Sequence, residues 1–65
     1  MDINKAIDYL KNGDIERGKK LLEELRKENP NDKETLYNLG MAYSETGEYE
    51  KSAEALEYAL VSEYR

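Results

Sequence analysis

The sequence contains no cysteine and no histidine. Without cysteine the chain cannot form a disulfide, a thiolate metal site or a thiol nucleophile. Without histidine it lacks the commonest general base and the commonest zinc ligand. Its glycines are dispersed and form no phosphate-binding loop. We therefore expect no catalytic residue, no metal and no cofactor.

Basic residues are also scarce, because ten Lys and Arg stand against fifteen Asp and Glu and give a net charge of −5. Such an acidic surface repels a phosphate backbone, so we expect no nucleic-acid partner. No apolar run approaches the length of a membrane span, and we expect no membrane partner. The N-terminus, Met1-Asp2-Ile3-Asn4, lacks the basic start and apolar stretch of a secretory signal, which predicts a cytoplasmic location.

Proline and glycine are few, and between them apolar residues recur at helical spacing. The turn signals are Asn12-Gly13, Asn29-Pro30-Asn31 and Thr46-Gly47. They predict four helices at about residues 2–12, 14–28, 32–46 and 48–64. Asn31, with Glu34 three residues later, predicts a capping box at the start of the third helix. Short turns make neighbouring helices antiparallel, so we expect two helical hairpins in one domain, 1–65.

The two hairpins repeat each other with a period of about 34 residues. This repeat shift places Tyr9 on Tyr43, Gly13 on Gly47, Asp14 on Glu48 and Leu22 on Leu56. One helical hairpin per unit of this length is typical of a solenoid array. We therefore assign the first repeat to about residues 1–32 and the second to about 33–65.

Residues 33–65 resemble a tetratricopeptide repeat. The matching residues are Leu36-Tyr37-Asn38-Leu39-Gly40-Met41-Ala42-Tyr43, Gly47-Glu48-Tyr49-Glu50-Lys51-Ser52, Leu56 and Ala59. Residues 1–32 match through Ala6, Tyr9, Gly13, Asp14, Gly18, Leu22 and Pro30. Asp2 and Lys5 depart from the pattern, because the family has large apolar side chains there. The resemblance implies an all-α fold of two helix–turn–helix repeats, with four antiparallel helices forming a fragment of a right-handed α-solenoid.

Within the second repeat, we expect the small residues Gly40 and Ser52 to let the two helices approach closely. The side chains expected to fill the space between helices are Leu36, Leu39, Tyr43 and Leu56.

The first helix can be placed in two registers. One keeps the repeat shift, so that Tyr9 matches Tyr43. The other slides the helix by one residue, pairs Ile3 with Leu36 and Leu10 with Tyr43, and shortens the turn. The sequence leaves both open.

The resemblance implies a non-catalytic protein–protein interaction module, since tetratricopeptide proteins bind peptides or helices in a concave groove lined by the first helix of each repeat. By matched position, the groove residues are Ile3, Ile7, Leu10, Lys11, Glu34, Tyr37, Asn38, Met41, Ser44 and Glu45. An apolar surface with acidic ends predicts an amphipathic partner segment with a basic flank. In the alternative interpretation, the apolar members of this set are core contacts.

Asn38 matches an asparagine that holds the C-terminus of a chaperone in the carboxylate-clamp members of the family. Ile3 and Ile7, however, stand where such a clamp needs lysine and asparagine, and a third repeat is missing. We therefore expect no carboxylate clamp.

The last predicted helix is apolar on more than one face, through Ala53, Ala55, Leu56, Tyr58, Ala59, Leu60, Val61 and Tyr64. The last unit of an array normally has a polar outer face. This pattern favours self-association through Tyr58, Val61 and Tyr64, with a two-fold dimer as the first expectation, or a truncated or engineered piece of a longer array. The other interpretation is an ordinary amphipathic helix with exposed tyrosines.

Overall fold

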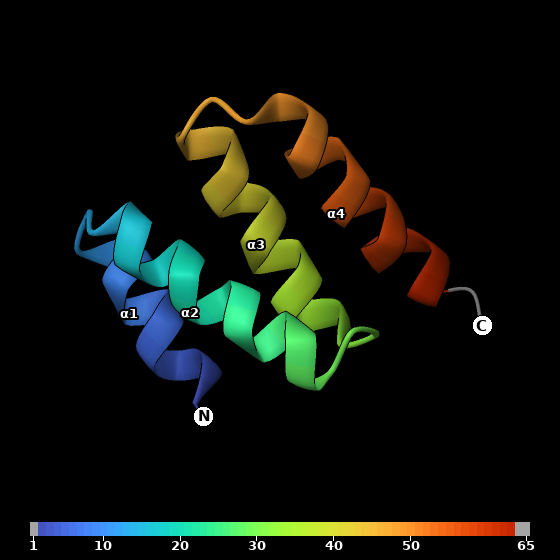
Figure 1. Cartoon of the computed structure of the whole chain (residues 1–65), viewed down its shortest axis with the longest axis horizontal. Helices are drawn as coiled ribbons and strands as arrows, with labels where there is room; N and C mark the ends of the chain where they lie inside the picture. The colour runs from blue at the N-terminus through green and yellow to red at the C-terminus, as the bar shows by residue number, and fades with distance from the viewer. Residues whose placement is uncertain (1, 64–65) are drawn as a thin grey trace.

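The computed structural model describes residues 2–63 and consists of four antiparallel helices joined by short turns (Figure 1). They are α1 (Ile3–Lys11), α2 (Ile15–Glu28), α3 (Lys33–Glu45) and α4 (Tyr49–Glu63). No strand occurs between residues 2 and 63. The all-α fold of two helical hairpins is confirmed, and each helix begins and ends within one residue of its predicted position.

Aspartates begin two of the helices. The carboxylate of Asp2 accepts the backbone N–H of Asn4 at 3.0 Å, at the start of α1. Asp32 accepts the N–H of Thr35 at 3.4 Å and its hydroxyl at 2.6 Å, at the start of α3. The prediction that Asn31 caps α3 is therefore wrong by one residue, because Asp32 is the residue whose carboxylate reaches the third N–H of the helix.

Both hairpins turn in the same way. Gly13 and Gly47 both have a positive φ, a backbone conformation that strains residues with a Cβ. The turns are closed by equivalent bonds of 2.8 Å, from Asp14 N–H to Tyr9 C=O and from Glu48 N–H to Tyr43 C=O. The turn after α1 is therefore not shortened. Of the two registers, the one that keeps the repeat shift is observed, and the slid register is wrong.

The helices form an open array rather than a closed bundle. Each helix packs against the next one along the chain, and α1 also touches α3. Within the described range, the backbone of α4 lies close only to α3, although the Arg26 side chain of α2 reaches Glu54 of α4 at 3.7 Å. Figure 1 places α1 and α4 at opposite ends of the molecule. The extents of 33 × 25 × 16 Å show that the array is flat. One face of α4 is consequently left without a neighbour.

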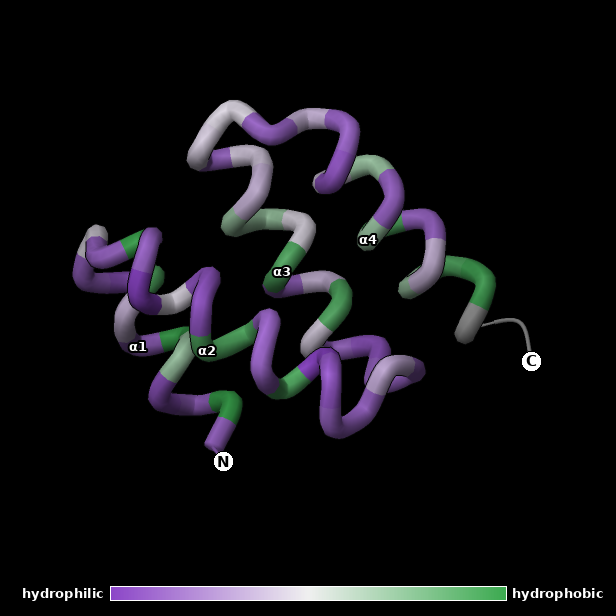
Figure 2. Tube along the Cα trace, viewed as in Figure 1, coloured by the Kyte–Doolittle hydropathy of each residue, from purple (hydrophilic) through white to green (hydrophobic). Residues whose placement is uncertain are grey.

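The core lies along the contact between α2 and α3. The cluster of buried residues there comprises Ala6, Leu22, Leu25, Leu39, Ala42 and Tyr43. Leu22, Leu36 and Leu39 are the largest fully buried side chains, each worth about 1.5–3 kcal/mol of hydrophobic stabilisation. Figure 2 shows apolar residues along α3 and again near the end of α4, where no core cluster covers them.

Each hairpin closes over a glycine. A Cβ at Gly18 in α2 would lie 2.6 Å from Cδ2 of Leu10, so this leucine packs directly on the glycine backbone. In the second hairpin a Cβ at Gly40 in α3 would lie 2.7 Å from Cγ of Leu56. Ser52 is also buried there and donates its hydroxyl to the carbonyl of Gly40 at 2.8 Å. The close approach predicted for Gly40 and Ser52 is confirmed.

Candidate functional site

Tyr37 and Met41 are exposed on α3, one helical turn apart. The two residues are 55% and 46% accessible, so they are not core contacts. The repeat shift matches them with Ile3 and Ile7 of α1. Both isoleucines are half-buried, and Ile3 packs against the core cluster. The apolar surface on this side of the array is therefore contributed mainly by α3.

The other residues predicted for the α1–α3 side have mixed positions. Leu10 is half-buried, packs on the core and covers Gly18. Asn38 is half-buried, and its side chain donates to the backbone carbonyl of Glu34 at 2.9 Å, within its own helix. Exposed members of the set are Lys11, Glu34, Ser44 and Glu45. The structure thus packs Ile3 and Leu10 of α1 against the core cluster and leaves the tyrosine and methionine of α3 accessible.

An apolar hollow with a volume of about 720 Å³ lies between α3 and α4. We call it the α3–α4 groove. It is lined by Lys33, Glu34, Tyr37, Ala53, Leu56, Glu57, Ala59 and Leu60. A hollow of this size falls within the range of ligand pockets. Sequence reasoning assigned Glu34 and Tyr37 to a binding surface but missed the contribution of α4.

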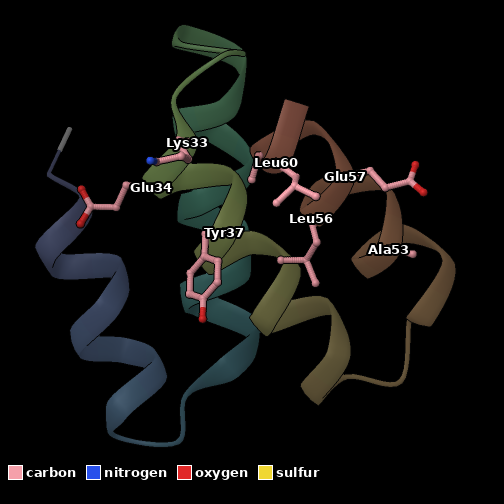
Figure 3. Close-up of a pocket in the computed structure, with 8 residues that line it drawn as sticks. Lys33, Glu34, Tyr37, Ala53, Leu56, Glu57 and Leu60 are labelled. Atoms are coloured by element: carbon pink, nitrogen blue, oxygen red, sulfur yellow. The ribbon is translucent and has the colours of Figure 1, made fainter. Parts of the chain in front are cut away.

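Two leucines of α4 form one wall of the groove. In Figure 3, Leu56 and Leu60 extend from α4 toward α3, Tyr37 lies on the exposed face of α3, and Glu57 points away from α3. Leu56 is 37% and Leu60 57% exposed, although both are aliphatic. Glu34 adds a second carboxylate to the lining. The groove is apolar at its centre, and its lining also includes two carboxylates, from Glu34 and Glu57, and one amine, from Lys33.

The residues predicted to mediate self-association lie beside this groove rather than in it. Tyr58 and Val61 are both exposed on α4, and neither lines the α3–α4 groove. Tyr64 lies outside the described residues.

Two polar contacts between the hairpins shift the pKa values of residues that form them. The amine of Lys19 lies 2.8 Å from a carboxylate oxygen of Glu48. That bond, with a second from the hydroxyl of Thr46, lowers the pKa of Glu48 from 4.5 to about 2, while the bond to Glu48 raises the pKa of Lys19. Burial, with a 2.6 Å hydrogen bond to Glu23, raises the pKa of Tyr43 from 10.0 to about 12. The Lys19–Glu48 and Tyr43–Glu23 contacts join the two hairpins, which is a structural role.

The described part of the chain offers little for other chemistry. Residues 2–63 hold no group of three acidic, histidine or cysteine side chains placed to bind a metal ion. Among the same residues, no helix combines the length and the apolar character that crossing a bilayer requires.

Comparison with known families identifies the repeat. A family model described as a tetratricopeptide repeat matches residues 3–64, which is nearly the whole chain. Neither the curated proteins nor the solved structures yielded a match.

Proposed function

Because the chain belongs to the tetratricopeptide repeat family, whose repeats generally mediate protein–protein interactions, we propose that it binds a polypeptide partner on the exposed apolar surface of α3 and does not act on it chemically. The observation that carries this proposal is the exposure of Tyr37. This residue belongs both to the predicted α1–α3 groove and to the lining of the α3–α4 groove.

The chemistry of this surface favours an amphipathic segment. Tyr37 and Met41 provide large, accessible apolar side chains on one face of α3. Aromatic side chains and methionine are enriched at the centres of protein interfaces, where aromatic rings bury much area. Glu34 and Glu45 lie on the same helix and are exposed, which suits a basic flank on the partner.

A peptide-display selection tests the proposal. The intact chain is used to select peptides, and the affinity of the selected sequences is measured by titration calorimetry. We expect binding at micromolar affinity that Tyr37→Glu and Met41→Glu weaken by about tenfold or more, because a carboxylate would be buried in an apolar contact. Tyr49→Glu is the matched control, since Tyr49 is an exposed tyrosine outside both surfaces.

Equal effects of Tyr37→Glu and Tyr49→Glu would contradict the proposal. So would a selection that yields no peptide binding to the folded chain.

A second candidate function is self-assembly through α4. Tyr58 and Val61 are exposed beside Leu60, so α4 presents apolar side chains well beyond the α3–α4 groove. Light scattering coupled to size exclusion tests this candidate. A dimer that Tyr58→Glu or Val61→Glu converts to monomer, while Met41→Glu leaves it intact, is the expected result. A monomer at millimolar concentration would rule it out.

A further inference from the structure

The molecule already contains one helix bound to a helical hairpin, because α3 packs on α2. In that contact Leu22 and Leu25 of α2 are buried with residues of α3, and Glu23 accepts the hydroxyl of Tyr43 at 2.6 Å. Cations lie at both ends of this contact, but their partners lie outside α3. Lys19 pairs with Glu48, in the turn before α4, at 2.8 Å, and Arg26 pairs with Glu54 of α4 at 3.7 Å. We call these five positions, Lys19, Leu22, Glu23, Leu25 and Arg26, the α2 face.

The α4 wall of the α3–α4 groove is the repeat counterpart of the α2 face. The repeat shift carries the α2 face onto Ala53, Leu56, Glu57, Ala59 and Leu60, and all five line the groove. The opposite wall corresponds as well. Tyr37 is the counterpart of Ile3, which packs against the core cluster. Six of the eight residues that line the groove therefore repeat positions of a surface that this protein uses to hold a helix, whereas Lys33 and Glu34 have no counterpart in the sequence.

The differences between the two surfaces define what the groove recognises. Lys19 and Arg26, the two cations of the α2 face, are replaced by Ala53 and Leu60. Leu25 is replaced by the smaller Ala59, which leaves more room for the partner's side chains. The hydrogen-bond acceptor is retained, because Glu57 stands in the position of Glu23. In Figure 3, the side chain of Glu57 points away from α3.

We propose that the α3–α4 groove binds an amphipathic helix of a separate polypeptide, and that the apolar residues of this helix follow the same pattern as the buried residues of α3. This face has aliphatic residues at the first and fourth positions, a small residue at the seventh and a tyrosine at the eighth, as in Leu36, Leu39, Ala42 and Tyr43. The tyrosine hydroxyl donates to Glu57 as Tyr43 donates to Glu23. The inference rests on the proposed polypeptide-binding function and names its partner.

The charges of the chain argue that α1 of a second copy does not supply this helix. The repeat shift matches Leu36 and Leu39 of α3 with Asp2, the cap of α1, and Lys5 of α1. Both Asp2 and Lys5 are exposed. Stacking α1 on the groove would bury a carboxylate and an amine without defined partners, which is strongly unfavourable. The lining has two carboxylates, Glu34 and Glu57, against one amine, Lys33, so its net negative charge favours a helix with a basic flank.

The α3 segment itself is the probe. A synthetic peptide with the sequence of residues 32–47, in which Glu45→Lys supplies the basic flank, is titrated into the intact isotope-labelled chain and followed by amide chemical shifts. We expect saturable binding with the largest shifts around Leu56 and Leu60. Leu60→Glu should weaken it by about tenfold or more. Val61→Glu, the neighbouring exposed aliphatic residue outside the groove, should leave the affinity unchanged.

A double-mutant cycle tests the hydroxyl contact. A peptide with Tyr43→Phe should bind about tenfold more weakly to the natural chain, because a hydrogen bond to a charged acceptor is lost. The same change should have little effect on a chain with Glu57→Ala.

Three outcomes would overturn the inference. The first is no binding of the peptide while display-selected peptides bind through Tyr37 and Met41; this leaves the proposed function standing. The second is shifts centred on Leu22 and Leu25, which would mean that the peptide displaces α3 itself. The third is a dimer that Leu60→Glu dissociates, which would make a second copy the occupant. Failure of both peptide sets would remove the proposed function too.

Discussion

The amine of Lys19 in α2 lies 2.8 Å from a carboxylate oxygen of Glu48, which directly precedes α4. The two residues are 29 positions apart, so the contact joins the first hairpin to the turn of the second. Only 13% of the Lys19 side chain is exposed, and Thr46 donates its hydroxyl to the same oxygen at 2.5 Å. This small network links the two hairpins beside the buried contact between α2 and α3.

The Glu48 contact predicts a loss of stability in acid. The folded-state pKa of Glu48 is about 2, against 4.5 for an ordinary glutamate, so the folded chain binds this proton more weakly than the unfolded chain. Its contribution is complete above about pH 4.5 and is lost as the pH falls toward 2. Thermal melts followed by circular dichroism should show this slope, and Glu48→Gln should reduce it. Glu50→Gln, at an exposed site nearby, is the control; equal slopes in both variants would contradict the assignment.

The contact between Tyr43 and Glu23 predicts a late step in alkali. Burial, with this hydrogen bond, raises the pKa of Tyr43 from 10.0 to about 12, so its stabilisation is complete below pH 10.0 and is lost as the pH rises through about 12. Ultraviolet titration of tyrosinate should contain a component near pH 12 that Tyr43→Phe removes. Tyr49→Phe should leave that component in place. Its persistence in Tyr43→Phe would show that another group causes it.

Leu22 and Leu56 occupy equivalent positions but should tolerate truncation differently. Leu22 is fully buried between α2 and α3, whereas Leu56 is 37% exposed because α4 packs against one helix, α3, in the described structure, while α2 packs against two. We expect Leu22→Ala to lower the free energy of unfolding by about 2–5 kcal/mol. Leu56→Ala should lower it by about 1 kcal/mol, because it removes less buried area. Urea denaturation measures both, and equal losses would mean that α4 is covered in solution.

Gly47 should be replaceable by asparagine more readily than by alanine. Its positive φ strains a residue with a Cβ, although no atom lies within 4 Å of where that Cβ would be. Gly47→Ala should therefore lower the free energy of unfolding by about 1–2 kcal/mol through backbone strain alone. Gly47→Asn should lose less, since asparagine tolerates this conformation better. Thermal melts compare the two; no difference would indicate that the turn relaxes.

Most of the fold could be predicted from local chemistry. Gly13 and Gly47 end their hairpins' first helices because their positive φ values favour glycine, and Pro30 separates the two hairpins. The start of α3 was misplaced by one residue because Asn31 and Asp32 are both good capping residues. Propensity does not distinguish two adjacent caps; the geometry that lets Asp32 reach Thr35 does.

The candidate site was less predictable. The exposure of Tyr37 and Met41 follows from their matched positions on α3, and the structure agrees with it. Leu56 was expected to fill the space between helices. It does pack on Gly40, yet it also lines the α3–α4 groove. Whether a leucine of α4 is core or surface depends on what lies beyond α4, and the pattern of this helix alone does not carry that information.

The pairing of leucine with glycine changes helices between the two hairpins. In the first, Leu10 of α1 covers Gly18 of α2, and in the second, Leu56 of α4 covers Gly40 of α3. The repeat shift matches Gly18 with Ser52. The glycine and leucine that touch in the first hairpin are therefore not matched with those that touch in the second. A single consensus sequence used for both hairpins would lose both leucine–glycine contacts. The two hairpins have the same helix–turn–helix shape, but the helix that supplies the glycine and the helix that supplies the leucine are exchanged between them. A substitution at these contacts must therefore be chosen separately for each hairpin.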